Sequence, residues 1–153
     1  MNQISEFSAA AAAAYAVVDS ERFAVRATTA WRVLVVEDVP SLQKLLVLML
    51  RKAGHEVFAA STGREAVEAA IHQEFDFVLM DIQMPGMNGI DAMRAIRAHE
   101  AQHGGRAVIV AITAHSLNGD SPTCQAAGAD AWLRKPVNLV DLLALLKRLD
   151  SAR

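Results

Sequence analysis

The chain has few of the features that mark secreted, membrane-spanning or nucleic-acid-binding proteins. Its 153 residues include one cysteine, Cys124, which excludes an internal disulfide and fits a reducing compartment, so we expect a cytoplasmic location. No apolar run approaches the roughly 20 residues that a bilayer span requires. The net charge of −2 and the lack of a Lys/Arg-rich run argue against nucleic acid or a membrane surface as a partner.

Apolar residues, by contrast, are abundant. Hydrophobic residues make up 53% of the chain and charged residues 21%, which is typical of one globular domain with a substantial core. Residues 1–30 differ from the rest because they contain the alanine run Ala9–Ala14, which favours a helical arm but offers little apolar area to anchor it. We expect a leader or linker over 1–30, the main domain over 31–150, and a short tail over 151–153.

Five short apolar runs alternate with segments of helical periodicity. The runs rich in β-branched and aromatic residues, each predicted to be a strand, cover residues 31–36, 55–60, 75–81, 107–112 and 130–133. Alternation at this spacing requires right-handed parallel crossovers. The sequence therefore predicts an α/β fold, a (βα)5 doubly wound parallel sheet of the flavodoxin type with strand order 2-1-3-4-5.

Local signals predict where several helices begin and which faces they bury. Pro40 fits a first turn, Ser61 or Thr62 caps the next helix with Glu65 reaching back, and Ser121-Pro122 starts the fourth helix. Two apolar sets are predicted to face inward, one in the second helix and one in the last: Ala66, Val67, Ala70 and Ile71, and Leu139, Leu142, Leu143, Leu146 and Leu149.

Carboxylates follow two neighbouring strands of the predicted sheet. Glu37 and Asp38 end the first strand and Asp81 ends the third. In the predicted order these strands are adjacent, so their carboxyl ends converge at one rim. Two carboxylates about 4 Å apart repel by roughly 4 kcal/mol at an effective dielectric of 20, so either one acid is protonated or a hard cation binds. Oxygen ligands with positions left for water and phosphate suit Mg²⁺.

The ends of the last two strands complete this rim. Thr113 follows the fourth strand and offers a hydroxyl, and Lys135 follows the fifth and adds a fixed positive charge. A divalent ion, a lysine and a hydroxyl around one aspartate make a site for a phosphoryl group. We expect the Asp81 carboxylate to attack phosphorus in line and to form an aspartyl phosphate.

Residues 32–149 resemble the receiver domains of bacterial two-component response regulators and phosphorelays. The resemblance rests on four motifs in the order in which such domains carry them: Val35-Val36-Glu37-Asp38, Met80 to Gly89, Ala111-Ile112-Thr113-Ala114, and Gly128 to Pro136. It implies phosphorylation of Asp81 by a histidine kinase or a histidine phosphotransfer protein. It also implies Mg²⁺ ligation by Glu37, Asp38, Asp81 and the carbonyl of Gln83, contacts of Thr113 and Lys135 with the phosphoryl oxygens, and a cis Lys135–Pro136 bond.

As a receiver, the chain is expected to act as a switch and not as an enzyme, apart from catalysing its own phosphorylation and dephosphorylation. Thr113 should move toward the phosphoryl oxygens, and Trp132, which stands where such domains usually carry Tyr or Phe, should fill the vacated space. The predicted partner surface combines the fourth helix, the fifth strand and the last helix. We expect no output domain, so output is contact with a downstream protein or onward phosphotransfer. A stand-alone regulator and the receiver portion of a hybrid kinase both remain open.

Three other functions fit the residues less well. A haloacid-dehalogenase-like phosphatase needs a second acid two residues after the nucleophile, where this chain has Gln83. A flavodoxin-like cofactor binder lacks its phosphate loop, since Glu37-Asp38 would repel a phosphate. A receiver that acts without phosphorylation is disfavoured by the complete acidic set.

Overall fold

The computed structural model describes residues 30–114 and 117–153. The predicted leader lies outside the described residues except for Ala30, as do His115 and Ser116. Strands and helices alternate along the chain, and their bounds are β1 Arg32–Val36, α2 Pro40–Lys52, β2 Glu56–Ala60, α3 Gly63–His72, β3 Phe77–Asp81, α4 Gly89–His103, β4 Val108–Thr113, α5 Leu117–Ala127, β5 Ala131–Arg134 and α6 Leu139–Ser151.

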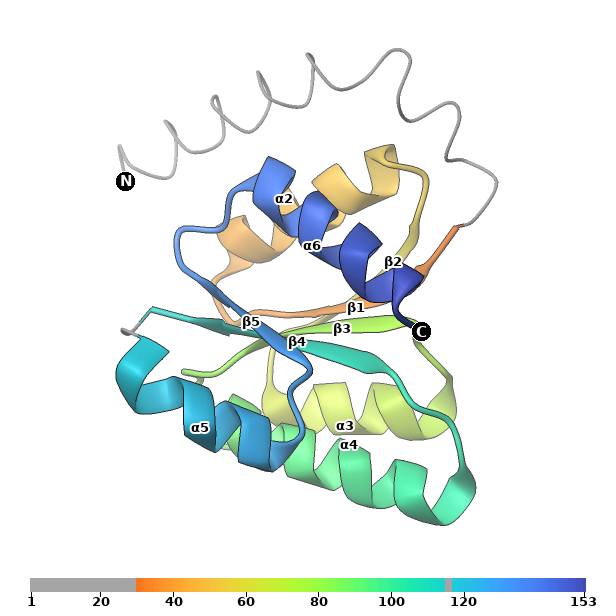
Figure 1. Cartoon of the computed structure of the whole chain (residues 1–153), viewed down its shortest axis with the longest axis vertical. Coiled ribbons are helices and arrows are strands. Elements are labelled where there is room, and N and C mark those ends of the chain that lie inside the picture. The colour runs from red at the N-terminus through yellow and green to blue at the C-terminus, as the bar shows by residue number, and fades with distance from the viewer. Residues whose placement is uncertain (1–29, 115–116) are drawn as a thin grey trace.

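The five strands form one parallel sheet in the order β2-β1-β3-β4-β5, which confirms the predicted doubly wound topology. Helices cover both faces: α2 and α6 lie on one side, and α3, α4 and α5 on the other (Figure 1). The chain order reverses between β1 and β3, so the carboxyl ends of these two strands border the switch point of the sheet. None of the described helices combines the length and apolar character that a bilayer span requires.

Alternate side chains of each central strand enter two separate cores. Val33 and Val35 of β1 pack on the α2/α6 side, whereas Leu34 and Val36 pack on the α3/α4/α5 side. All five residues of β3 are buried, which confirms that this strand is covered on both faces. The central strands therefore have little freedom to shift, and the residues that follow them are held in place.

The helix signals were largely confirmed. Pro40 is the first residue of α2, and Gly54 follows that helix with a φ of 96°. Thr62 caps α3 by accepting a hydrogen bond from the Glu65 N–H. In a capping box, the Glu65 side chain would accept from the backbone N–H of the cap residue, Thr62. Its Oε2 accepts instead from the backbone N–H of the preceding residue, Ser61, at 2.8 Å. Of the two predicted caps, Thr62 is therefore the one that caps α3, and Ser61 contributes only its backbone N–H.

Two local predictions were wrong. The fourth predicted helix, α5, begins at Leu117 and not at Ser121-Pro122, so Pro122 lies inside it. Proline removes one N–H but keeps a helical φ, and the buried Cys124 and Ala127 hold this helix against the sheet. Ile71, predicted to face inward, is 48% exposed because α3 ends one residue later and its last turn leaves the core. In α6 the inward stripe also includes Leu145, which is buried.

Candidate functional site

Three carboxylates meet at the carboxyl ends of β1 and β3. Glu37 and Asp38 directly follow β1, and Asp81 is the last residue of β3. The two strands pair in parallel, with Val36 opposite Met80, so the residues that follow them lie side by side. Each of the three side chains offers one oxygen within 4.8 Å of the others. Glu37 and Asp81 are only 2% and 1% exposed, so the predicted convergence of the acids is confirmed and two of them are out of solvent.

Lys135 supplies the positive charge of this cluster. It directly follows β5, and its backbone N–H donates to the Thr113 carbonyl at 2.8 Å. The Lys135 Nζ lies 3.1 Å from Glu37 Oε2 and 3.3 Å from Asp81 Oδ2. Burial lowers the pKa of Lys135, but the fields of Asp81 and Glu37 outweigh burial and raise it overall, so the ammonium stays charged. The Lys135–Pro136 bond is cis, as predicted.

Asp81 has an unusually weak acidity for an aspartate. Burial, followed by the negative charge of Glu37, raises its pKa to about 6, although Lys135 and the Gln83 N–H act in the opposite direction. The Gln83 N–H donates to Asp81 Oδ1 at 3.2 Å, whereas Asp81 Oδ2 is buried and accepts no hydrogen bond. This second oxygen is in ion-pair contact with Lys135 at 3.3 Å, and it keeps the capacity to bind a further positive or electrophilic group.

The donor set fits a hard divalent cation. Three carboxylates supply oxygen ligands that lie close together, the single ammonium of Lys135 pairs with two of them, and Asp38 is only half-buried, which leaves access from solvent. A cation there would relieve the repulsion that raises the pKa of Asp81. Gln83, whose carbonyl was predicted as a further ligand, is exposed and follows Asp81 by two residues.

The two predicted switch residues lie on the neighbouring strands. Thr113 is the last residue of β4 and is 1% exposed, and β4 pairs directly with β3. Trp132 is partly buried on β5, opposite Ala111, and packs on the core formed with α3, α4 and α5. Thr113 therefore borders the acidic cluster, whereas Trp132 lies one strand further from it, as the sequence predicted.

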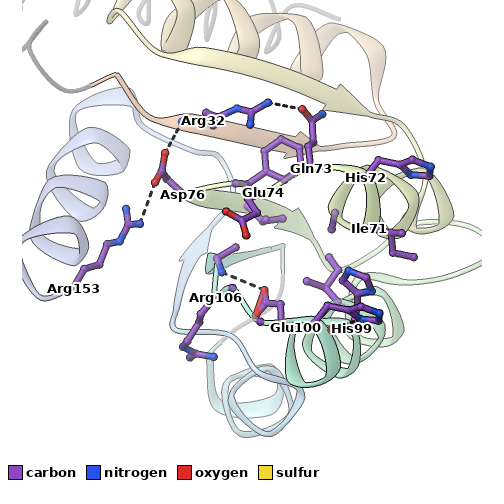
Figure 2. A pocket seen from close by; sticks show the side chains of 18 residues that line it. Arg32, Ile71, His72, Gln73, Glu74, Asp76, His99, Glu100, Arg106 and Arg153 are labelled. Atoms are coloured by element: carbon purple, nitrogen blue, oxygen red, sulfur yellow. Dashed lines mark hydrogen bonds and ion pairs between the residues drawn. The ribbon is translucent and has the colours of Figure 1, made fainter.

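A separate cleft of about 540 Å³ lies at the opposite end of the strands (Figure 2). Asp76 is held on both of its oxygens there: Arg153 pairs with one at 3.0 Å, and the backbone N–H of Arg32 donates to the other at 2.8 Å. Because these strands are parallel, their amino ends and carboxyl ends form opposite rims. The cleft is therefore distinct from the acidic cluster.

Arg97 was not among the candidate functional residues predicted from the sequence. The structure makes it the centre of a partly buried network: its guanidinium donates to Glu100, Asp130 and the carbonyls of Ala107 and Gly128. The network joins α4 to the turn between α5 and β5. The one sequence signal for this role of Arg97 was that a basic residue occupies an inward-facing position of the helical pattern.

Gln43 was also missed. It lies in α2 beside the acidic cluster, and its side chain bonds to backbone carbonyls that flank the cluster. Because a carbonyl acceptor has no sequence signature, no residue pattern could have revealed this contact.

Comparison with known proteins points to one family. The family model described as the response regulator receiver domain matches residues 33–147. The sensor protein GacS of Pseudomonas syringae pv. syringae is 43% identical over 108 residues, which are 70% of this chain and 12% of GacS. The chain likewise spans only 4–16% of other curated sensor kinases that it matches.

Solved structures agree with this match. The receiver domain of the sensor histidine kinase PA1611 from Pseudomonas aeruginosa, crystallised with a magnesium ion in its active-site cleft, is 38% identical, with a TM-score of 0.70 over 78% of this chain and 97% of that one. The Saccharomyces cerevisiae complex of the phosphotransfer protein Ypd1 with the Ssk1 receiver domain matches at 32% identity, with a TM-score of 0.74 over 77% of this chain and 87% of that one.

Proposed function

Because this chain belongs to the response regulator receiver family, we propose that Asp81 is its phosphoacceptor and that the chain is a switch in a two-component phosphorelay. Receiver domains are signalling switches and not enzymes that act on a separate substrate. The observation that carries the assignment of Asp81 is its position: it ends a fully buried strand, beside Glu37, and its Oδ2 lies 3.3 Å from the Lys135 Nζ that also contacts Glu37.

The geometry supports an in-line transfer. An Asp81 oxygen forms a bond to phosphorus while the P–N bond of a phosphohistidine breaks, and the electron pair of that bond returns to the imidazole. Asp81 must be ionised to attack, and with a pKa of about 6 it is mostly ionised at neutral pH. Lys135 offsets the charge of the incoming phosphoryl oxygens. We assign to Thr113 a hydrogen bond to one of these oxygens.

Magnesium is the cofactor that this donor set favours. We propose that Glu37, Asp38, Asp81 and the carbonyl of Gln83 hold it, directly or through water. When bound, Mg²⁺ would supply positive charge to the phosphoryl oxygens. The magnesium ion in the cleft of the PA1611 receiver supports this assignment.

Histidine-containing phosphodonors are the proposed upstream partners. The curated relatives are sensor and hybrid kinases, and a structural neighbour was crystallised with a phosphotransfer protein. A histidine kinase or a phosphotransfer protein therefore delivers the phosphoryl group to Asp81. Downstream, we propose a protein target that contacts the face of α5, β5 and α6, with no nucleic acid or membrane involved and with a cytoplasmic location. The chain then acts alone or as the receiver part of a hybrid kinase.

A direct test is phosphorylation by a small-molecule donor. The protein is incubated with acetyl phosphate and Mg²⁺, and intact mass spectrometry should detect one hydroxylamine-labile phosphoryl group. Asp81→Asn should fold and gain none. Asp91→Asn, which changes an exposed aspartate of α4, is the matched control and should behave as the unmodified protein. Labile phosphorylation of Asp81→Asn at the wild-type level would overturn the assignment.

A further inference from the structure

Gln43 connects the two loops that border the acidic cluster. It lies in the first turns of α2, and its Nε2 is 3.1 Å from the Glu37 carbonyl and 3.0 Å from the Ala60 carbonyl. Ser61 Oγ is a third acceptor at 3.1 Å. One side-chain amide thus reaches the residue after β1, the last residue of β2 and the residue that follows it.

These contacts close a ring around the backbone of Glu37. The Glu37 N–H donates to the Ala60 carbonyl at 3.1 Å, and the same carbonyl accepts from Gln43. Gln43 also donates to the Glu37 carbonyl. Both backbone polar groups of Glu37 are therefore tied down, so the chain leaves β1 in one direction.

The backbone of Glu37 determines where two carboxylates lie. The Glu37 side chain accepts from the Val39 N–H at 3.2 Å through Oε1 and pairs with Lys135 at 3.1 Å through Oε2. The Glu37 carbonyl belongs to the peptide unit that leads into Asp38, so fixing it also orients that residue. Carboxylates that are held in place before a cation arrives bind it more tightly, because less ordering remains to be done.

We propose that Gln43 is a positioning residue that sets the Mg²⁺ affinity of the Glu37, Asp38 and Asp81 cluster by holding the Glu37 backbone. The inference rests on the proposed function, since it requires that the cluster bind Mg²⁺. It adds a residue that touches neither the cation nor the phosphoryl group. It also joins the cluster to the start of α3, because the Ser61 N–H donates to Glu65 of that helix.

The test compares two glutamine-to-methionine variants. Gln43→Met keeps the length of the side chain and removes its donors. The control, Gln73→Met, removes an amide that bonds to Arg32 at the opposite rim of the sheet. Isothermal titration should give a Mg²⁺ dissociation constant about tenfold higher for Gln43→Met and unchanged for Gln73→Met. In the metal-free protein, the amide signals of residues 37–39 should shift in the first variant alone.

Kinetics separate positioning from general damage. With acetyl phosphate, Gln43→Met should need about tenfold more Mg²⁺ for half-maximal phosphorylation but should recover the wild-type rate at saturating Mg²⁺. Ser61→Ala, which removes only the third acceptor, should keep the wild-type dissociation constant. If Ser61→Ala weakens Mg²⁺ binding as much as Gln43→Met does, the bond to Ser61, and not the hold on the Glu37 backbone, sets the affinity, and the proposal is wrong.

Two further outcomes are decisive. If Gln43→Met does not fold, Gln43→Ala takes its place, because the shorter side chain lets water bond to the freed carbonyls, and the same tenfold loss is expected. Equal dissociation constants in the Gln43 variant and Gln73→Met overturn the positioning role while the proposed function stands. Failure of the unmodified protein to bind Mg²⁺ or to accept a phosphoryl group overturns the proposed function itself.

Discussion

The Lys135 ammonium lies 3.1 Å from Glu37 Oε2, although the two residues are 98 positions apart in the chain. The glutamate side of this ion pair is 2% exposed and the lysine side 24%. Lys135 thus balances the buried carboxylates before any cation or phosphoryl group arrives. A cation that enters the cluster must compete with it, and a phosphoryl group must draw it away from Glu37.

Lys135→Met should therefore change three properties in different directions. Loss of the competing charge should tighten Mg²⁺ binding about three- to tenfold. Phosphorylation by acetyl phosphate at saturating Mg²⁺ should become slower, because the transferred oxygens lose a positive partner. The free energy of unfolding at pH 7.5 should fall by about 1–3 kcal/mol, since Glu37 stays buried without its counter-ion. Titration calorimetry, phosphorylation rates and urea denaturation measure the three.

Arg134→Met is the control for Lys135→Met, because Arg134 is the adjacent exposed cation at the end of β5. It should leave the Mg²⁺ affinity and the phosphorylation rate near the wild-type values. Weaker Mg²⁺ binding in Lys135→Met would contradict the competition between lysine and cation.

The raised pKa of Asp81 predicts two pH dependences. Between its ordinary pKa near 3.9 and its folded value of about 6, the folded protein holds more protons than the unfolded chain. Stability should therefore decrease as the pH rises through this window. Mg²⁺ affinity should fall about tenfold per pH unit below pH 6, because the ligand must lose its proton. Denaturation and titration between pH 4.5 and 8 test both.

Asp81→Asn is the reference for these measurements, because it keeps the volume of the side chain and removes its titration. Its unfolding free energy should lack the decrease with rising pH that Asp81 causes. If the difference in stability between wild type and Asp81→Asn is the same at pH 4.5 and pH 7, Asp81 does not titrate near pH 6.

His55 predicts a loss of stability with acid. Its Nδ1 accepts from the backbone N–H of Trp31 at 3.2 Å, and its ring stacks on the Trp31 ring with centroids 4.4 Å apart. Burial lowers the pKa of His55, which Asp76 only partly offsets. The folded protein thus resists protonation, so the contribution of His55 is complete above pH 6.5 and is lost as the pH falls through the lowered folded value.

His55→Asn keeps an acceptor for the backbone N–H of Trp31 without a titrating ring. Between pH 7.5 and 5.5, wild type should lose up to about 1 kcal/mol of unfolding free energy relative to this variant, a figure reduced for the partial exposure of the ring. Thermal denaturation at a series of pH values measures the difference. A constant difference across this range would rule out titration of His55.

Trp132 should report the switch. In a Trp31→Phe background it is the only tryptophan, and phenylalanine can keep the aromatic contact of position 31 with Phe77. Addition of Mg²⁺ and a beryllofluoride phosphoryl mimic should change the Trp132 emission, because movement of Thr113 alters the space beside β5. The change should weaken in Thr113→Ala. Unchanged emission, with unchanged amide shifts over residues 114–136, would show that this switch mechanism does not operate here.

The residues at the strand ends could be predicted from the sequence alone. Glu37, Asp38, Asp81, Thr113 and Lys135 each follow or end a strand whose apolar run is visible in the sequence. Parallel pairing must bring such positions to one rim, so their convergence could be predicted before any distance was known. Helix caps such as Thr62 were predictable for the same reason, because caps depend on neighbours within three or four residues.

Other features depend on distances between segments far apart in the chain. The pairing of Lys135 with both Glu37 and Asp81, the pKa of Asp81, and the contacts of Gln43 and Arg97 with carbonyl groups follow from how strands and helices pack. The start of α5 before Pro122 and the exposure of Ile71 were misjudged because tertiary packing outweighed local preference. The hydrophobic periodicity and the type of residue that ends each strand depend on only a few neighbouring residues, so both can be recognised in the sequence. Electrostatic fields and backbone acceptors come from elements that only folding brings together.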